Sequence, residues 1–272
     1  MQKIFNITNK YIVLATPLIL YSLISTVYLA VSMGAGKIIN LIFAIILFAL
    51  MTGAFIAGWF NMIKNAIINP EKEDPNTLIQ EFPSGVGEFF LSSLGAIFVI
   101  FIFSTLMLIC SYFIGANTIG DPGVSADALA SALKNTEALK TFVSSLSIEQ
   151  LTKINLWNML ILGTLTLIYY SLFLYMPALF FKNKNPFIAF FISLKDLFSK
   201  KILKTTGIFL LIFVFNFFLS LFSTILGANV FIHFILTLLN FYFITLVGVG
   251  VFYYYYHNFI KPMIGQNVDV EI

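Results

Sequence analysis

Six long apolar segments are the feature that most restricts what this chain can fold into. They cover residues 11–32, 38–60, 89–114, 156–181, 205–226 and 230–254, and none contains a lysine, arginine, aspartate or glutamate. An α-helix rises about 1.5 Å per residue, so about 20 apolar residues are needed to cross roughly 30 Å of hydrocarbon. Each segment meets that length. The sequence therefore predicts an all-α, polytopic membrane protein whose six transmembrane helices form a single membrane domain.

The composition excludes the main alternatives to a membrane protein. The 272 residues are 60% hydrophobic and 10% charged, against roughly 45–50% and about 25% in soluble domains. Such a chain is neither soluble nor disordered, and its single cysteine rules out a disulfide scaffold. The first segment follows Lys3 and Lys10 as a secretory signal would, but it is longer than an ordinary signal core. We therefore expect it to be a retained helix.

The lysines predict the orientation and the surroundings. All 15 basic residues are lysines, and eleven of them lie in the segments on one side of the six spans. Positive residues are retained on the cytoplasmic side, so both termini are expected in the cytoplasm. A net charge of +3 carried by lysines that flank apolar runs favours the lipid bilayer and anionic lipid headgroups over nucleic acid as partners. Richness in Lys, Asn, Ile, Phe and Tyr is associated with AT-rich bacterial genomes, which suggests the bacterial cytoplasmic membrane.

The connection at residues 182–204 predicts an amphipathic helix at the membrane interface. After Pro186, apolar residues recur with helical spacing, while Ser193, Asp196, Lys200 and Lys204 gather on the opposite face. The apolar positions are Phe187, Phe190, Phe191, Leu194, Leu197, Phe198 and Ile202. Contact with anionic lipid or with a membrane protein partner is expected at Lys195, Lys200, Lys201 and Lys204. The alternative is an elbow that only packs beneath the helices.

Two further connections carry helix signals. After residue 60 the second helix continues until Asn69 and Pro70, and Pro75 then begins a short interfacial helix. Gly85 and Gly87 are expected to form the turn into the third span. Residues 116–155 predict an extracytoplasmic helical cap with a helix that begins after Ser125, where Leu129, Leu133 and Leu139 are expected on the inner side. Ser147 and Gln150 have the spacing of a capping box before the fourth span. This cap either shields an opening or only covers helix ends.

Aromatic and small residues add predictions about membrane depth and packing. Trp59, Trp157 and the tyrosines at 253–256 lie at span ends, where they are expected to form interfacial belts. In the second span Gly53 and Ala57, and likewise Ala54 and Gly58, are spaced by four residues, which allows another backbone to approach. Pro177 predicts a break in the fourth span.

The sequence holds no motif that supports catalysis. It contains no nucleophile elbow, phosphate loop or calcium loop. His233 and His257 lie 24 residues apart, or about 36 Å along a continuous helix, so they cannot share a metal ion. We therefore expect no enzymatic activity, no catalytic residue, no metal and no cofactor.

Asn216 and Asn240 are the strongest polar candidates within the spans. They lie at matching depths on two consecutive helices joined by a short turn at residues 227–229. One interpretation is a hydrogen bond between the helices. The other is an intramembrane polar site on a solute path.

A 30-residue stretch resembles the elbow in the membrane domain of bacterial glycerophosphodiester phosphodiesterases and related six-helix membrane proteins. The residues that carry the resemblance are Tyr175, Met176, Pro177, Pro186, Phe187, Ala189, Ser193, Leu194, Lys200 and Lys201. In that family a span ending in proline is followed by an amphipathic helix with a basic end. This chain lacks the arginine often found beside the serine, and it has no soluble phosphodiesterase domain, so the resemblance implies a location and a fold but not that activity.

Two hypotheses about function follow. The first is an integral protein of the bacterial cytoplasmic membrane that acts as a non-enzymatic scaffold, lipid-interacting protein or accessory subunit through the helix at residues 186–204. The second is a transporter or permease for a small or lipid-like solute, which would pass near Asn216, Asn240 and Pro177.

Overall fold

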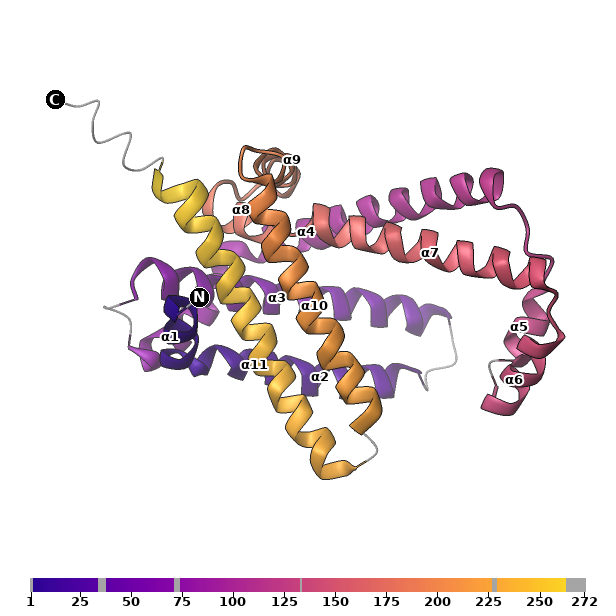
Figure 1. The fold of residues 1–272 in the computed structure, drawn as a ribbon. Helices are drawn as coiled ribbons and strands as arrows, with labels where there is room; N and C mark the ends of the chain where they lie inside the picture. The colour runs from indigo at the N-terminus through magenta and orange to yellow at the C-terminus, as the bar shows by residue number, and fades with distance from the viewer. Residues whose placement is uncertain (1, 34–37, 71–73, 133, 227–228, 263–272) are drawn as a thin grey trace. The chain divides into compact units, whose positions relative to one another are not determined.

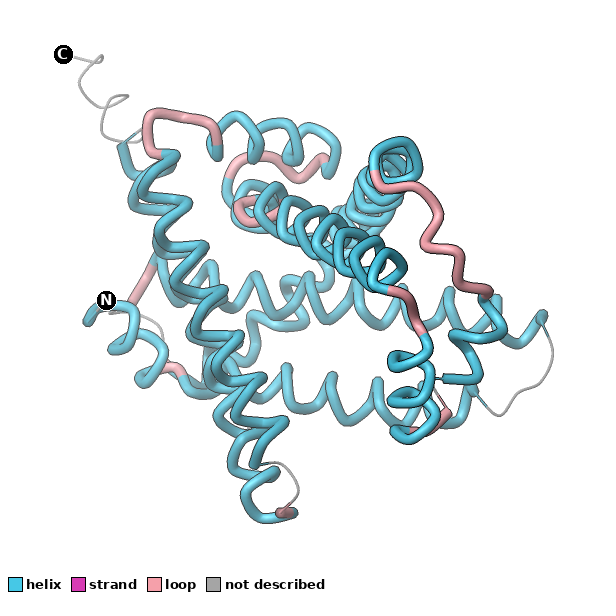
Figure 2. The backbone as a smooth tube through the Cα atoms, turned by 45° about the vertical axis from the view of Figure 1, so that its right-hand side comes forward, coloured by secondary structure: helices cyan, strands magenta, loops and turns pink. Residues whose placement is uncertain are grey.

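The computed structural model describes residues 2–33, 38–70, 74–132, 134–226 and 229–262. Within these ranges every regular element is a helix, as Figure 1 and Figure 2 show. In chain order they are α1 (Gln2–Lys10), η1 (Ile12–Leu14), α2 (Ala15–Met33), α3 (Ile38–Ile68), α4 (Pro75–Thr118), α5 (Ala126–Ala132), α6 (Thr136–Ser145), α7 (Ile148–Ser171), α8 (Tyr175–Phe181), α9 (Pro186–Leu197), α10 (Ile202–Leu226), α11 (Val230–Tyr255) and η2 (Tyr256–Ile260).

Six helical segments are long and apolar enough to cross a membrane. They are Ile12–Ser32, Ile39–Ile68, Pro75–Thr118, Ile148–Phe181, Ile202–Leu226 and Val230–Ile260. The all-α, six-helix membrane architecture is therefore confirmed. The fourth span is interrupted between α7 and α8, because Pro177 has no N–H to donate to the carbonyl four residues earlier.

The helices form two compact units. The first contains residues 1–99 and 171–272, and the second contains residues 100–170. Helix α4 contributes its first part to one unit and its last part to the other, and nearly all of α7 belongs to the second.

The first unit has an aromatic core. The Phe180 ring of α8 stacks on Phe89 of α4, with centroids 4.4 Å apart, and meets Phe60 of α3 edge to face. Phe60 in turn stacks on Phe252 of α11 at 5.0 Å. Such ring pairs contribute about 0.5–1.5 kcal/mol beyond their burial. The core thus joins helices that are far apart in the sequence.

Small residues let α4 lie close against α3. A Cβ added to Gly53 would lie 2.6 Å from Leu94, and one added to Gly58 would lie 2.6 Å from the Phe82 ring. The predicted close packing of the second span is confirmed.

The expected turn at Gly85 and Gly87 is wrong. Helix α4 runs without interruption from Pro75 through Pro83 to Thr118. A Cβ on Gly85 would lie 2.7 Å from the carbonyl oxygen of Ala57 and would also meet Asn61. The glycine therefore serves helix contact rather than chain reversal.

Three of the expected belt residues, Trp59, Tyr254 and Tyr255, are instead buried in the first unit. Trp59 is only 5% exposed, and its indole Nε1 donates to the carbonyl oxygen of Leu14 over 2.8 Å. Tyr255 is completely buried. The belt prediction is wrong at these positions, because the indole N–H and the phenol hydroxyl find protein partners.

Helix α1 precedes the first span and was not predicted. It packs against α11, and the Tyr242 hydroxyl of α11 donates to Asn9 Oδ1 over 2.6 Å. Ile7 and Thr8 are its buried residues.

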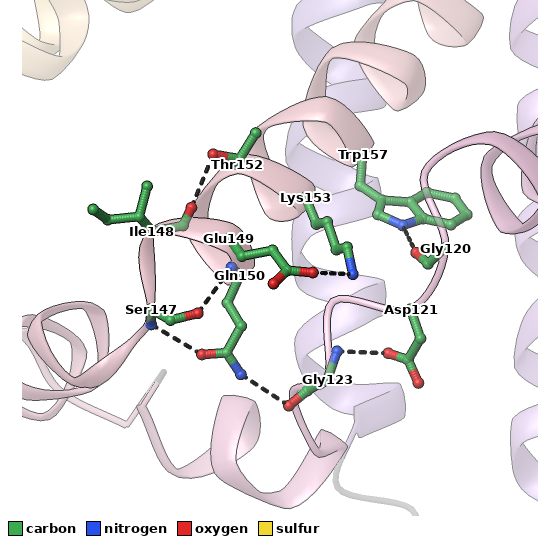
Figure 3. Close-up of polar contacts among 10 residues, drawn as sticks. All are labelled: Gly120, Asp121, Gly123, Ser147, Ile148, Glu149, Gln150, Thr152, Lys153 and Trp157. Atoms are coloured by element: carbon green, nitrogen blue, oxygen red, sulfur yellow. Dashed lines mark hydrogen bonds and ion pairs between the residues drawn. The ribbon is translucent and has the colours of Figure 1, made fainter.

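The second unit contains the helical cap, whose polar contacts are drawn in Figure 3. The predicted capping box is confirmed: Gln150 N donates to Ser147 Oγ over 3.2 Å, and Ser147 N donates to Gln150 Oε1 over 3.0 Å. Gln150 Nε2 also donates a hydrogen bond to the carbonyl oxygen of Gly123, and Trp157 Nε1 donates one to the carbonyl oxygen of Gly120.

The cap has two helices where the sequence predicted one. Ser125 Oγ accepts from Ala128 N at the start of α5, as predicted, and Asn135 Oδ1 accepts from Ala138 N at the start of α6. Leu139 was expected on the inner side but is 38% exposed. Leu133 and the side chain of Leu129 lie outside the described residues.

Candidate functional site

Helix α9 is the centre of the predicted contact site, and local sequence signals determine where it begins. Asn185 Oδ1 accepts hydrogen bonds from Phe187 N at 3.0 Å and from Ile188 N at 3.3 Å. Pro186 occupies the first helical position, where its missing N–H costs nothing. The helix ends at Leu197, so it is shorter than the predicted helix up to Lys204, which belongs to α10.

The polar face of α9 points inward, which corrects the prediction. Ser193 is completely buried, and its hydroxyl donates to the Phe190 carbonyl oxygen over 2.7 Å. Ala189, Phe190 and Leu197 are buried as well, so the buried side combines predicted polar and predicted apolar positions. Helical periodicity did not separate the side that meets protein from the side that meets lipid, because both accept apolar side chains.

Asp196 joins three elements of the first unit. Its Oδ2 lies 2.8 Å from Lys182 Nζ, directly after α8, and accepts the Tyr255 hydroxyl of α11 over 2.5 Å. The Lys182 and Asp196 side chains are only 14% and 13% exposed. Removing one partner of such a buried pair leaves an uncompensated charge, so this ion pair determines how α9 is attached.

The outward side of α9 is aromatic and basic. Phe187, Phe191 and Phe198 are more than half exposed. Lys195 and Lys200 are also exposed. Aromatic side chains beside lysines are the composition of a helix at the boundary between hydrocarbon and headgroups.

The four predicted contact lysines differ in exposure and in partners. Lys195, Lys200 and Lys204 are exposed and Lys201 is half-buried, while Lys201 and Lys204 both lie over aromatic rings near the end of α11. Lys201 Nζ donates to the Asn258 carbonyl oxygen and lies 5.0 Å from the centre of the Phe259 ring. Lys204 Nζ lies 5.7 Å from the centre of the Tyr254 ring. Cations are favoured at helix C-termini, so Lys201 has a structural partner inside the protein.

The structure does not join Asn216 and Asn240. Both side chains are exposed, on α10 and α11. None of the hydrogen bonds between described residues connects them, although the two helices are in contact. The hydrogen bond between the two helices, one of the two interpretations of these asparagines, is therefore not formed among the described residues.

An apolar cavity of about 430 Å³ lies elsewhere in the first unit, between α2, α3 and the start of α4. No sequence pattern predicts this cavity. Its walls include Leu20, Phe55 and Met62. Runs of apolar residues do not reveal where helix packing leaves a gap.

The described residues and the comparisons place no known chemistry on this chain. No group of three His, Cys, Asp or Glu side chains within the described ranges is arranged to hold a metal ion. Comparison of the chain with models of protein families, with curated proteins and with solved structures found no match. The most developed site in the first unit is therefore α9 with its buried ion pair and its exposed lysines.

Proposed function

We propose that this chain is an integral protein of the bacterial cytoplasmic membrane that acts without enzymatic chemistry, as a lipid-interacting scaffold or accessory subunit. The observation that carries the proposal is the outward side of α9, where exposed Phe187, Phe191 and Phe198 accompany exposed Lys195 and Lys200. The rings suit the hydrocarbon boundary, and the ammonium groups suit phosphate oxygens.

The orientation proposed here follows the lysine distribution, with both termini and α9 at the cytoplasmic leaflet. Anionic lipids give this leaflet a negative surface potential, which attracts lysines near it. The resemblance of residues 175–201 to the elbow of six-helix membrane domains agrees with a membrane-surface role. Transport of a polar solute has no support from Asn216 and Asn240, because both side chains lie on the helix surface.

Replacing Lys195 and Lys200 with glutamine tests the proposal. The full chain would be placed in nanodiscs of phosphatidylglycerol and phosphatidylcholine, and association of spin-labelled forms of the two lipids would be measured. We expect Lys195→Gln with Lys200→Gln to lower the preference for phosphatidylglycerol, since each lysine near an anionic surface contributes about 1 kcal/mol. That energy corresponds to about a five-fold change in affinity per lysine.

The matched control removes the same amount of charge from the cap, which the proposed orientation places on the opposite side of the membrane. Lys134→Gln with Lys140→Gln changes two exposed lysines of the cap and should leave the preference unchanged. High salt should reduce the preference of the unaltered chain. An equal preference in the α9 double variant and the unaltered chain would refute lipid contact by α9.

A further inference from the structure

The apolar cavity of the first unit has a defined length and direction. On α3 its wall runs from Met51 to Met62, eleven residues or about 16 Å of helix. On η1 and α2 the wall runs from Val13 to Ile24. The two walls are antiparallel, because Tyr21 stacks on Phe55 at 4.3 Å while Trp59 donates to the Leu14 carbonyl oxygen. The cavity is therefore an elongated slot parallel to two spans.

The chemistry of the walls selects an apolar occupant. None of the thirteen described residues that line the cavity is charged, and only Thr16 and Tyr21 carry a polar atom. The Tyr21 hydroxyl already shares a 2.8 Å hydrogen bond with Thr52 Oγ1. A polar solute would lose its hydration without new partners. The volume of about 430 Å³ falls within the range of about 300–1,000 Å³ typical of ligand pockets.

The position of the mouth identifies the occupant. Leu20, Ile24 and Ile79 line the cavity and are about half exposed, so the slot opens at the surface of candidate spans. Around such spans the surrounding solvent is the acyl chain of a lipid. A slot of about 16 Å matches half of the roughly 30 Å hydrocarbon thickness, which is one leaflet.

A cation and hydrogen-bond donors mark one end of the slot. Lys10 precedes the lining residue Val13 by three positions, and its exposed ammonium group donates to the Pro70 carbonyl oxygen over 2.5 Å. An ammonium group has three donors, so further donors can reach a phosphate oxygen. Tyr11 donates to the same carbonyl oxygen over 2.8 Å but is completely buried, so Lys10 is the group at this end that suits a headgroup.

We propose that the cavity binds one acyl chain of a membrane phospholipid, inserted from the leaflet at the Lys10 end. The inference rests on the proposed lipid-interacting function and adds a specific site to it. Phe55 lines the cavity and is half-buried, with the Tyr21 ring stacked on it at 4.3 Å. A lipid chain inside the slot therefore contacts the part of Phe55 that remains accessible.

Photolabelling tests this assignment. The full chain in phosphatidylglycerol nanodiscs would receive a phosphatidylglycerol analogue with a diazirine midway along one acyl chain, and adducts would be located by peptide mass spectrometry. We expect adducts at Phe55 and Met51, two half-buried lining residues. Ala54→Phe places a ring in the slot and should reduce labelling of Phe55 several-fold. Leu20→Trp narrows the mouth at an exposed position and should have the same effect if Ala54→Phe prevents folding.

Two controls separate this inference from the proposal about α9. Leu47→Phe adds a similar ring at an exposed position of α3 and should leave Phe55 labelling intact. A choline headgroup on the same photolabel should still label Phe55, whereas the α9 lysine variants should alter only the preference between headgroups. Absence of Phe55 adducts in the unaltered chain, or equal labelling in Leu47→Phe and both blocking variants, would overturn the acyl-chain site without affecting the α9 proposal.

Discussion

The two compact units are both helical, but different interactions hold them together. In residues 1–99 and 171–272 the core consists of stacked rings, and Tyr175, Tyr255 and Met62 are completely buried. In residues 100–170 helix α6 has no buried residue, and α7 buries only Thr164 and Ile168. There the contacts include a helix cap, the Trp157 indole bond to the Gly120 carbonyl oxygen and a buried hydroxyl bond from Thr164 to Ser111. The first unit therefore depends on packed aromatic rings, and the second on helix caps and a few polar contacts.

The buried ion pair offers the largest expected difference between the units. Asp196→Asn leaves the ammonium group of Lys182, which is 14% exposed, without its carboxylate partner. We expect a loss of about 3–5 kcal/mol in the free energy of unfolding. Thermal unfolding in detergent, followed by helical circular dichroism, would measure it.

The matched change in the second unit is Glu149→Gln. The Glu149 carboxylate pairs with Lys153 at 2.8 Å but is 76% exposed, so solvent screens the pair. No measurable change in the unfolding temperature is expected. Equal unfolding temperatures for Asp196→Asn and Glu149→Gln would show that the two units do not differ in this respect.

Substitution of one glycine in each unit should produce effects of intermediate size on the free energy of unfolding. Gly85→Ala forces a Cβ against the Ala57 carbonyl oxygen and Asn61, and overpacking of this kind costs about 1–3 kcal/mol. Gly163→Ala in α7 meets nothing within 4 Å, so it should be neutral or stabilise by about 0.4–1 kcal/mol. The same unfolding measurement applies to both. The packing difference would be refuted if Gly163→Ala destabilised the chain as much as Gly85→Ala.

The smallest expected effect lies in the cap. Ser147→Ala removes the side-chain oxygen that accepts from Gln150 N, which should cost about 1 kcal/mol at this helix end. Hydrogen exchange should accelerate at the start of α7 and stay unchanged in α9. Faster exchange in α9 as well would show that the two units unfold together.

The sequence alone predicts the elements that depend on the surrounding solvent and on local backbone chemistry. The six spans follow from the absence of ionised residues over membrane-length runs. The end of α3 at Ile68, before Asn69 and Pro70, and the capping box at Ser147 follow from fixed local rules. None of these features requires knowledge of a neighbouring helix.

Other features depend on neighbours that the sequence does not identify. Ser193 and Asp196 were predicted on a polar face but pack inward, because Lys182 and Tyr255 provide partners for Asp196 and the Phe190 carbonyl oxygen accepts from Ser193. Gly85 looked like a turn, but it lets α3 approach. In a membrane, apolar residues suit both protein and lipid, so periodicity does not tell the two sides of a helix apart.

The length of α4 has a geometric consequence for the bilayer. Its 44 residues extend about 66 Å. The charge-free run at residues 89–114 belongs to this helix, and about 20 apolar residues suffice to cross the hydrocarbon. The segment before that run, which carries Glu81 and Glu88, is therefore a helical extension into the headgroup layer or the water beyond it.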